Sequence, residues 1–198
     1  MSDRAAPRSR SGPRWAARLH AALPARRSWL KAMHAVMIPL FIWFMLVQPR
    51  DVVPLGPRAF QFHSVLGLIF STLAVIWTLD YLRRGLAGRP GPKLKPWQRR
   101  LHRALHHTLV LGIGFVALSG FLLGLTSARL LKAGGFLPIA PPLNMPQAND
   151  WIGTMHTIEF YSLGAVAAVH AGFHIWRHVR LKDNALRIMA PKALHRFL

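Results

Sequence analysis

The residues of this sequence with the clearest chemical potential are histidines inside apolar segments. The stretch Met155–Pro191 begins with an apolar run long enough to cross a bilayer, yet it contains His156, His170, His174 and His178. Ionisable side chains inside a membrane are costly and usually functional. His156 and His170 lie fourteen residues apart, so on a helix they share one face and are separated by roughly 21 Å along the axis. One helix can thus offer an imidazole near each side of a membrane, an arrangement that suits two stacked cofactors.

The composition indicates a membrane protein. Of 198 residues, 52% are hydrophobic, yet the formal net charge is +20, a combination that soluble domains of this size rarely show. Cysteine is absent, which excludes disulfides, iron–sulfur clusters and thiolate zinc sites. The basic residues lie between long apolar runs, where orientation in a membrane explains them better than nucleic acid does. We therefore expect contact with membrane lipid and no nucleic-acid partner.

Four apolar segments have about the 20 residues that a helix needs to cross the hydrocarbon core. They cover about residues 32–47, 60–82, 105–126 and 151–176. The connections between them are rich in proline, glycine or basic residues, as loops are. The sequence therefore predicts an all-α protein, a transmembrane four-helix bundle.

The predicted organisation has three parts. Residues 1–30 form a basic and partly disordered cytoplasmic extension, residues 31–180 the transmembrane bundle, and residues 181–198 a basic cytoplasmic tail.

The basic residues predict the orientation of this bundle. The N-terminal tail carries eight of the 26 lysines and arginines, the 83–103 loop another eight, and the chain from Arg177 onward six. The two opposite loops contribute only Arg50, Arg58, Arg129 and Lys132. Because basic loops stay in the cytoplasm, we expect both termini on the cytoplasmic side of a bacterial inner membrane.

In this topology the histidines sort by depth. His34 starts the first span and His170 lies toward the end of the fourth, so both are near the cytoplasm. His63 starts the second span and His156 the fourth, so both are near the outer face. Two pairs on facing helices, one in each leaflet, are what two bis-histidine haems require. We predict that these four histidines are the axial ligands of haem iron.

The spacing leaves the inner ligand open. His34 is three residues from Lys31, whereas His170 is seven from Arg177, so their depths match imperfectly. His174 matches His34 better and lies one turn along a neighbouring face. Zinc is a weaker alternative, because structural zinc needs four ligands in one site and these pairs are separated by most of the bilayer.

Other polar residues form a candidate quinone site at the cytoplasmic rim. His106 and His178 are possible quinone contacts, since a quinone headgroup needs polar donors beside an apolar slot. His102 and His106 lie four residues apart on one face, which equally suits a wet interfacial cluster. Glu159, about one turn from His156, either orients that ligand or is a rim carboxylate.

The closing stretch resembles the bacterial cytochrome b561 family. A histidine pair fourteen residues apart precedes KDNALRIMAP, like the family's H-K-D-x-x-L-x-R-M-x-P ending. The resemblance extends in outline over about residues 30–192 and implies a four-helix membrane cytochrome with two haems b. It implies His34 with His170 for the inner haem and His63 with His156 for the outer one. It favours His170 over His174, because His170 lies twelve residues before Lys182.

The sequence also departs from this family's pattern. Ala35 follows the first histidine where the family often has tryptophan, and Thr157 follows His156 where it often has glutamate. Ser119 stands in place of a proline, and Arg177 replaces the first member of a His-His pair whose second is His178. These changes bear on the substrate and quinone contacts.

The expected function is transmembrane electron transfer. The resemblance implies an oxidoreductase that passes electrons from an outer donor, with superoxide as one candidate, to ubiquinone. A second hypothesis is a membrane-anchor cytochrome b subunit that links quinone to a redox partner protein, a soluble dehydrogenase or hydrogenase. A third is a haem-free metal transporter.

Overall fold

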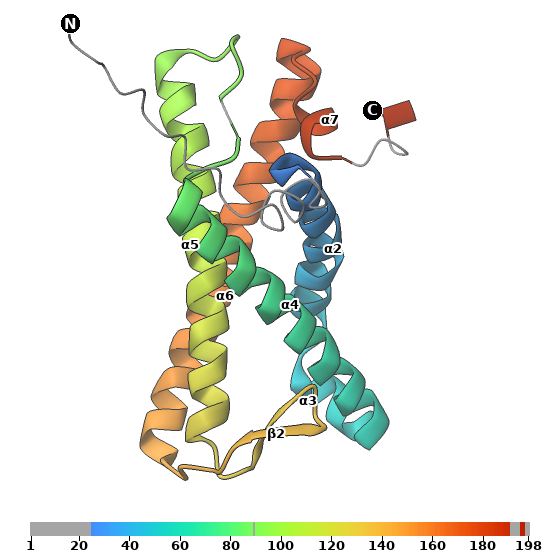
Figure 1. The fold of residues 1–198 in the computed structure, drawn as a ribbon, viewed down its shortest axis with the longest axis vertical. Coiled ribbons are helices and arrows are strands. Elements are labelled where there is room, and N and C mark those ends of the chain that lie inside the picture. The colour runs from blue at the N-terminus through green and yellow to red at the C-terminus, as the bar shows by residue number, and fades with distance from the viewer. Residues whose placement is uncertain (1–24, 89, 191–194, 197–198) are drawn as a thin grey trace, which may run out of the picture.

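The computed structural model describes residues 25–88, 90–190 and 195–196. Four long helices follow the four predicted spans (Figure 1): α2 (Arg26–Leu46), α4 (Pro57–Arg84), α5 (Pro96–Thr126) and α6 (Pro146–Trp176). The predicted all-α helical bundle is thereby confirmed. Most of the predicted N-terminal extension, up to residue 24, lies outside the described residues.

Three of the four long helices begin at a proline. Pro57, Pro96 and Pro146 are the first residues of α4, α5 and α6. Proline is favoured there because its fixed φ suits a helix and the N–H it lacks would have had no partner. Gly56 and Gly85, with φ of +100° and +68°, flank α4 and let the chain turn at both ends.

The connections contain more local structure than the sequence indicated. The predicted turn after α2 holds the short helices α3 (Pro49–Val52) and η1 (Val53–Leu55). The predicted loop after α5 forms a two-stranded antiparallel hairpin of β1 (Leu131–Ala133) and β2 (Leu137–Ala140). After α6 the chain continues through a π-helical turn, η2 (Arg177–Leu181), into the short helix α7 (Ala185–Met189).

The two ends of the bundle differ in character. One end, which we call the hairpin end, carries α3 and the β1–β2 hairpin (Figure 1). The other, which we call the basic end, gathers the start of α2, residues 90–95, the start of α5 and α7. At the basic end, Arg26 donates hydrogen bonds to Asp80 at 2.7 and 2.9 Å and to the Gly85 carbonyl at 2.6 Å.

The outer surface of the bundle is that of a membrane protein. Among the described helices, α2, α4 and α5 are long and apolar enough to cross a bilayer. Helix α6 equals α5 in length, at 31 residues, but it is not among these three candidate spans. Large hydrophobic side chains are exposed on all four helices, among them Ile42, Val75, Phe115 and Val169. A surface of this kind suits lipid and would aggregate in water. The chain is therefore a multi-pass membrane protein.

The helices pack unequally against one another. Helix α5 runs along α6 in the most extensive contact of the bundle, and α4 packs against both α2 and α5. The backbones of α2 and α4, in contrast, approach α6 at few points. Helix α6 is thus joined to the rest of the bundle mainly through α5.

An apolar, aromatic layer fills the middle of the bundle. Buried Met37, Phe70, Ala74 and Ala117 form one cluster, and buried Val116, Phe160 and Leu163 form a second. Phe41 and Phe44 pack against both clusters and so join them. The rings of Phe41 and Phe160 lie 5.2 Å apart between their centroids, which connects α2 to α6 in this layer.

Candidate functional site

The bundle carries histidines on both sides of the aromatic layer. His63 at the start of α4 and His156 in the first half of α6 lie toward the hairpin end. His34 of α2 and His170 of α6 lie toward the basic end. On α6 the two histidines are about 21 Å apart along the helix axis, and Phe160 and Leu163 of the aromatic layer lie between them.

At the basic end, α5 and α6 bring four histidine rings into one cluster. His102 and His106 of α5 have ring centroids 4.1 Å apart, and His170 and His174 of α6 have theirs 4.5 Å apart. Across the two helices, the His106 ring lies 4.8 Å from that of His170 and 5.6 Å from that of His174. His102 is only 3% exposed, so the sequence-based alternative of a wet interfacial cluster is wrong for this residue.

His34 approaches the same cluster from α2. Its ring packs edge-on against Trp77 at a centroid distance of 5.9 Å. A charge on His34 would be felt at both His106 and His170, so the three rings belong to one electrostatic environment. The predicted inner pair, His34 and His170, thus faces one region from two helices, and His174 lies one turn further along α6.

At the hairpin end, His156 belongs to a hydrogen-bonded chain with Ser119 and Glu159. The Ser119 hydroxyl has two acceptors in reach, Glu159 Oε2 at 2.7 Å and the Val116 carbonyl at 3.2 Å. The nearer carboxylate oxygen takes its hydrogen. The same Ser119 oxygen lies 2.9 Å from His156 Nδ1. With its own hydrogen given to the carboxylate, Ser119 accepts the Nδ1–H of His156. This tautomer leaves the Nε2 lone pair of His156 free to bind a metal.

Gly120 allows the His156 ring to lie close to α5. A Cβ built at position 120 would lie 3.2 Å from His156 Cε1, closer than most carbon contacts. The sequence indicated small residues along this helix but not which of them faces a histidine.

His63 has a different environment. It is 8% exposed, and the Phe44 ring meets it edge-on at 4.9 Å. The indole N–H of Trp43 donates to His63 Nδ1 at 3.2 Å. A neutral imidazole has one nitrogen that can accept a hydrogen bond or bind a metal, and in His63 this nitrogen is Nδ1. Ligation of iron through Nε2 therefore requires the hydrogen to move to Nδ1 and the Trp43 hydrogen bond to break.

The donor set fits haem b. Each level offers buried or half-buried imidazoles, which bind haem iron as neutral ligands. His156 has its Nδ1 anchored and its Nε2 lone pair available, as a ligating histidine requires. The helices that carry the predicted partners, α2 or α4 against α6, are those whose backbones make few contacts. The residues that would hold the haems are His34 with His170 for one and His63 with His156 for the other.

The quinone contacts predicted from the sequence lie at the basic end. His106 is part of the histidine cluster, and His178 lies in η2, one turn beyond His174. At the same end, Arg177 and Asp183 form a buried ion pair, with Nη2 and Oδ2 2.7 Å apart and side chains only 1% and 3% exposed. Sequence reasoning missed this pair, although Asp183 belongs to the KDN motif and Arg177 lies five residues before Lys182.

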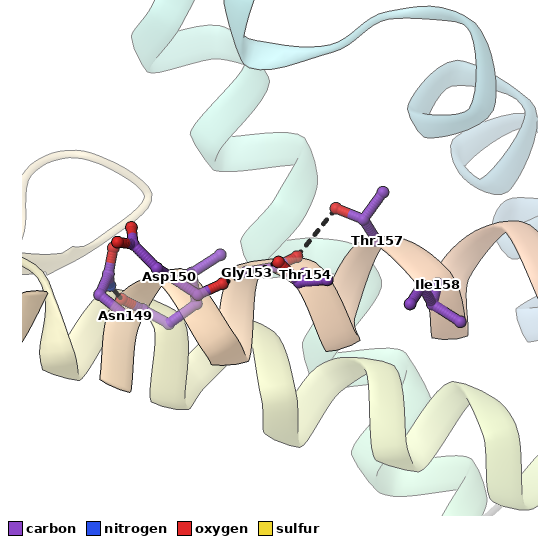
Figure 2. A pocket seen from close by; sticks show the side chains of 7 residues that line it. Asn149, Asp150, Gly153, Thr154, Thr157 and Ile158 are labelled. Carbon is purple, nitrogen blue, oxygen red and sulfur yellow. Dashed lines mark hydrogen bonds between the residues drawn. The ribbon is translucent and has the colours of Figure 1, made fainter. Parts of the chain in front are cut away.

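A separate cavity of about 440 Å³ lies at the hairpin end, along the first turns of α6 (Figure 2). Thr157 donates to the Gly153 carbonyl and Thr154 to the Asp150 carbonyl, so both hydroxyls are bonded within their own helix. None of its lining residues is a histidine. The cavity therefore has no part in haem ligation.

Comparisons with known proteins agree with the geometry. A family model described as prokaryotic cytochrome b561 matches residues 25–192, which is most of the chain. Cytochrome b561 homolog 2 of Escherichia coli (strain K12) is 23% identical over 172 residues, covering 83% of this chain and 87% of the relative. The resemblance inferred from the closing motif is thus confirmed. The chain belongs to the prokaryotic cytochrome b561 family and is a membrane cytochrome that transfers electrons through haem b.

Proposed function

We propose that this chain is a di-haem cytochrome that passes electrons from a donor at the hairpin end to ubiquinone at the basic end. The observation that carries the proposal is the presence of imidazoles at two levels of one bundle, with an aromatic layer between them. His63 and His156 would ligate the outer haem, and His34 and His170 the inner one. Bound haem b supplies a one-electron iron couple, and the protein supplies position, ligation and field.

The orientation follows from charge. The basic end carries most of the lysines and arginines of the sequence, and the positive-inside rule places such an end in the cytoplasm. The hairpin end then faces the periplasm of a bacterial inner membrane. Cleavage or labelling of a site introduced into the β1–β2 hairpin in intact spheroplasts tests this orientation.

The residues around the outer pair have distinct tasks. Ser119 and Glu159 orient His156 and place a negative charge behind it, which strengthens the imidazole as a ligand. Phe44 packs against His63, and Phe160 packs against His156, so each outer histidine has an aromatic neighbour from the middle of the bundle. Gly120 leaves space for the ring.

At the basic end we assign the quinone to the rim beside His106 and His178. Both side chains can bond a quinone oxygen, and the apolar cluster of Leu94, Leu105 and Phe173 lies at the same end. An apolar wall beside polar donors is what a prenylated headgroup requires.

The donor is a small species that reaches the hairpin end. Superoxide is one candidate. The loops at that end carry Arg50, Arg58, Arg129 and Lys132 against Asp51 and Asp150, a mild bias toward an anion.

The experiment that tests the proposal is a pyridine haemochrome assay with a redox titration on the purified protein. Two haems b per chain with two midpoint potentials are expected. A single haem would contradict the di-haem assignment. Ubiquinone reduction by the isolated chain in liposomes, with superoxide generated outside, then tests donor and acceptor. Quinone reduction only in the presence of a copurifying dehydrogenase or hydrogenase would instead favour the membrane-anchor function.

A further inference from the structure

The basic end holds more histidines than an inner haem uses. With His34 and His170 assigned to iron, three buried or half-buried histidines of this end remain close together: His102, His106 and His174. A metal ion bound by one nitrogen of His106 leaves the N–H of its other nitrogen for the proposed quinone contact. Each of these three places a ring nitrogen within 4.8 Å of the others. They come from two helices: His102 and His106 lie one turn apart on α5, and His174 faces them from α6.

Two of these rings carry buried nitrogen atoms that no hydrogen bond satisfies in the described structure. They are Nδ1 of His102 and Nε2 of His174. A buried polar atom without a partner destabilises the folded state, and a native protein rarely keeps two such atoms together without a reason. His102 is only 3% exposed, so solvent does not supply the missing hydrogen-bond partner. Buried imidazole nitrogens without a hydrogen-bond partner, in rings that bring ligand atoms this close together, are a typical feature of a metal site.

The surrounding charge does not exclude a cation. Arg177 is a positive group at this end of α6, and its guanidinium carbon lies 6.0 Å from the centroid of the Phe173 ring. However, Asp183 accepts hydrogen bonds from Arg177 Nε and Nη2 at 2.9 and 2.7 Å, so the guanidinium is paired and neutralised.

We propose that His102, His106 and His174 form a binding site for a divalent first-row transition-metal ion, separate from haem iron. Imidazole nitrogens suit Zn²⁺, Co²⁺, Ni²⁺ and Cu²⁺. Three histidines leave a fourth position for water or another ligand, as in zinc sites that keep an open position. The i, i+4 pair on α5 supplies two ligands from one rigid element, and His174 closes the site from α6.

A metal ion at this site has a consequence for electron transfer. It joins α5 to α6 directly beside His170, whose ring lies 4.8 Å from that of His106. The ion therefore adds positive charge next to the inner pair and none next to His63 and His156. This consequence rests on the proposed haem ligation, whereas the binding of the metal does not.

The test uses full-length, haem-loaded protein purified with a histidine-free tag and treated with EDTA before desalting. Zn²⁺ is titrated calorimetrically, and Co²⁺ is added separately so that its visible absorption reports tetrahedral nitrogen ligation. We expect saturable binding of about one Zn²⁺ per chain. His102→Gln and His106→Gln should each weaken it at least about 100-fold, because even changes outside the ligand shell cost about 10–100-fold. Haem content measured on the same samples shows that each variant is folded.

The matched control is His107→Gln on the same helix. His107 is exposed and interacts with the Tyr81 hydroxyl instead of the cluster, so this variant should bind Zn²⁺ as the unaltered protein does. Saturating Zn²⁺ should shift the midpoint potential of one haem and leave the other unchanged. Equal Zn²⁺ binding by the His102, His106 and His107 variants, or no saturable binding at all, would overturn the metal site. Unchanged haem content in the same samples would show that the haem assignment is not what failed. Loss of a haem in His174→Ala would also overturn it, because His174 would then be an iron ligand.

Discussion

Ser119 of α5 joins Glu159 to His156, with its hydroxyl oxygen 2.7 Å from the carboxylate and 2.9 Å from the imidazole nitrogen. This link depends on two departures from the family pattern noted in the sequence. Serine stands where the family has proline, and the glutamate lies one turn after the histidine instead of next to it. The serine hydroxyl spans the space between the Glu159 carboxylate and the His156 ring.

Loss of this link should raise the potential of the outer haem. In Ser119→Ala, His156 loses its hydrogen-bond acceptor and becomes a weaker donor to ferric iron. A hydrogen bond of about 0.5–1.5 kcal/mol corresponds to about 20–60 mV for a one-electron couple. A redox titration measures the shift, and Glu159→Gln should change the potential in the same direction. Thr157→Val is the control, since that hydroxyl donates to the α6 backbone. An unchanged potential in both variants would exclude the tuning role.

Replacement of either outer ligand should remove one haem and keep the other. His63→Ala and His156→Ala should each lose about half of the haem, because a bis-histidine site fails without one ligand. Trp43→Phe is a matched control: it removes the N–H donated to His63 but no ligand, so it should retain both haems. Pyridine haemochrome counts distinguish these variants. Full haem content in the two alanine variants would refute the pairing.

Two histidines one turn apart on α6, His170 and His174, are the candidate ligands of the inner haem. His170→Ala should abolish the inner haem, whereas His174→Ala should retain it, because His170 lies in the environment shared with His34 and His106. Low-temperature spectra and haem counts of both variants measure this. The reverse outcome would move the axial ligand to His174.

Gly120 should be sensitive to the addition of a single methyl group. A Cβ there meets His156 Cε1 at 3.2 Å, so Gly120→Ala should displace the ring and weaken outer-haem binding. Gly172→Ala on α6 adds the same methyl group into open space and should stabilise the helix by up to about 1 kcal/mol. Haem retention during heating compares the two variants. Equal retention would show that the ring has room to move.

Breaking the buried ion pair at the basic end should destabilise the protein strongly. Removal of one partner leaves a buried charge unpaired, at a cost of about 3–5 kcal/mol. Arg177→Ala and Asp183→Ala should therefore both lower the unfolding temperature in detergent, as followed by the Soret band. The double change of Arg177→Met with Asp183→Leu should be milder. Exposed Arg180→Ala serves as the control, with an effect within about 0.5 kcal/mol.

The sequence allowed prediction of the features that depend on periodicity and polarity. Apolar segment lengths located the four helices, and the positions of His34, His63, His156 and His170 within them predicted two levels. The helices begin before the apolar runs do, α5 by nine residues, α2 by six and α6 by five, because Pro96 and Pro146 start α5 and α6 inside polar sequence. Contacts between distant segments were not predictable. The Ser119 link, the burial of His102 and the Arg177–Asp183 pair each depend on how two elements face one another.

The uneven packing of the helices bears on how the protein is made. Since α6 is attached mainly through α5, the polypeptide alone holds its last long helix along one side. Ligation across α2, α4 and α6 would fasten the opposite side, so haem would act as an assembly factor as well as a redox group. Cells starved of haem should therefore accumulate little of this cytochrome, with newly inserted chains degraded by membrane quality-control proteases.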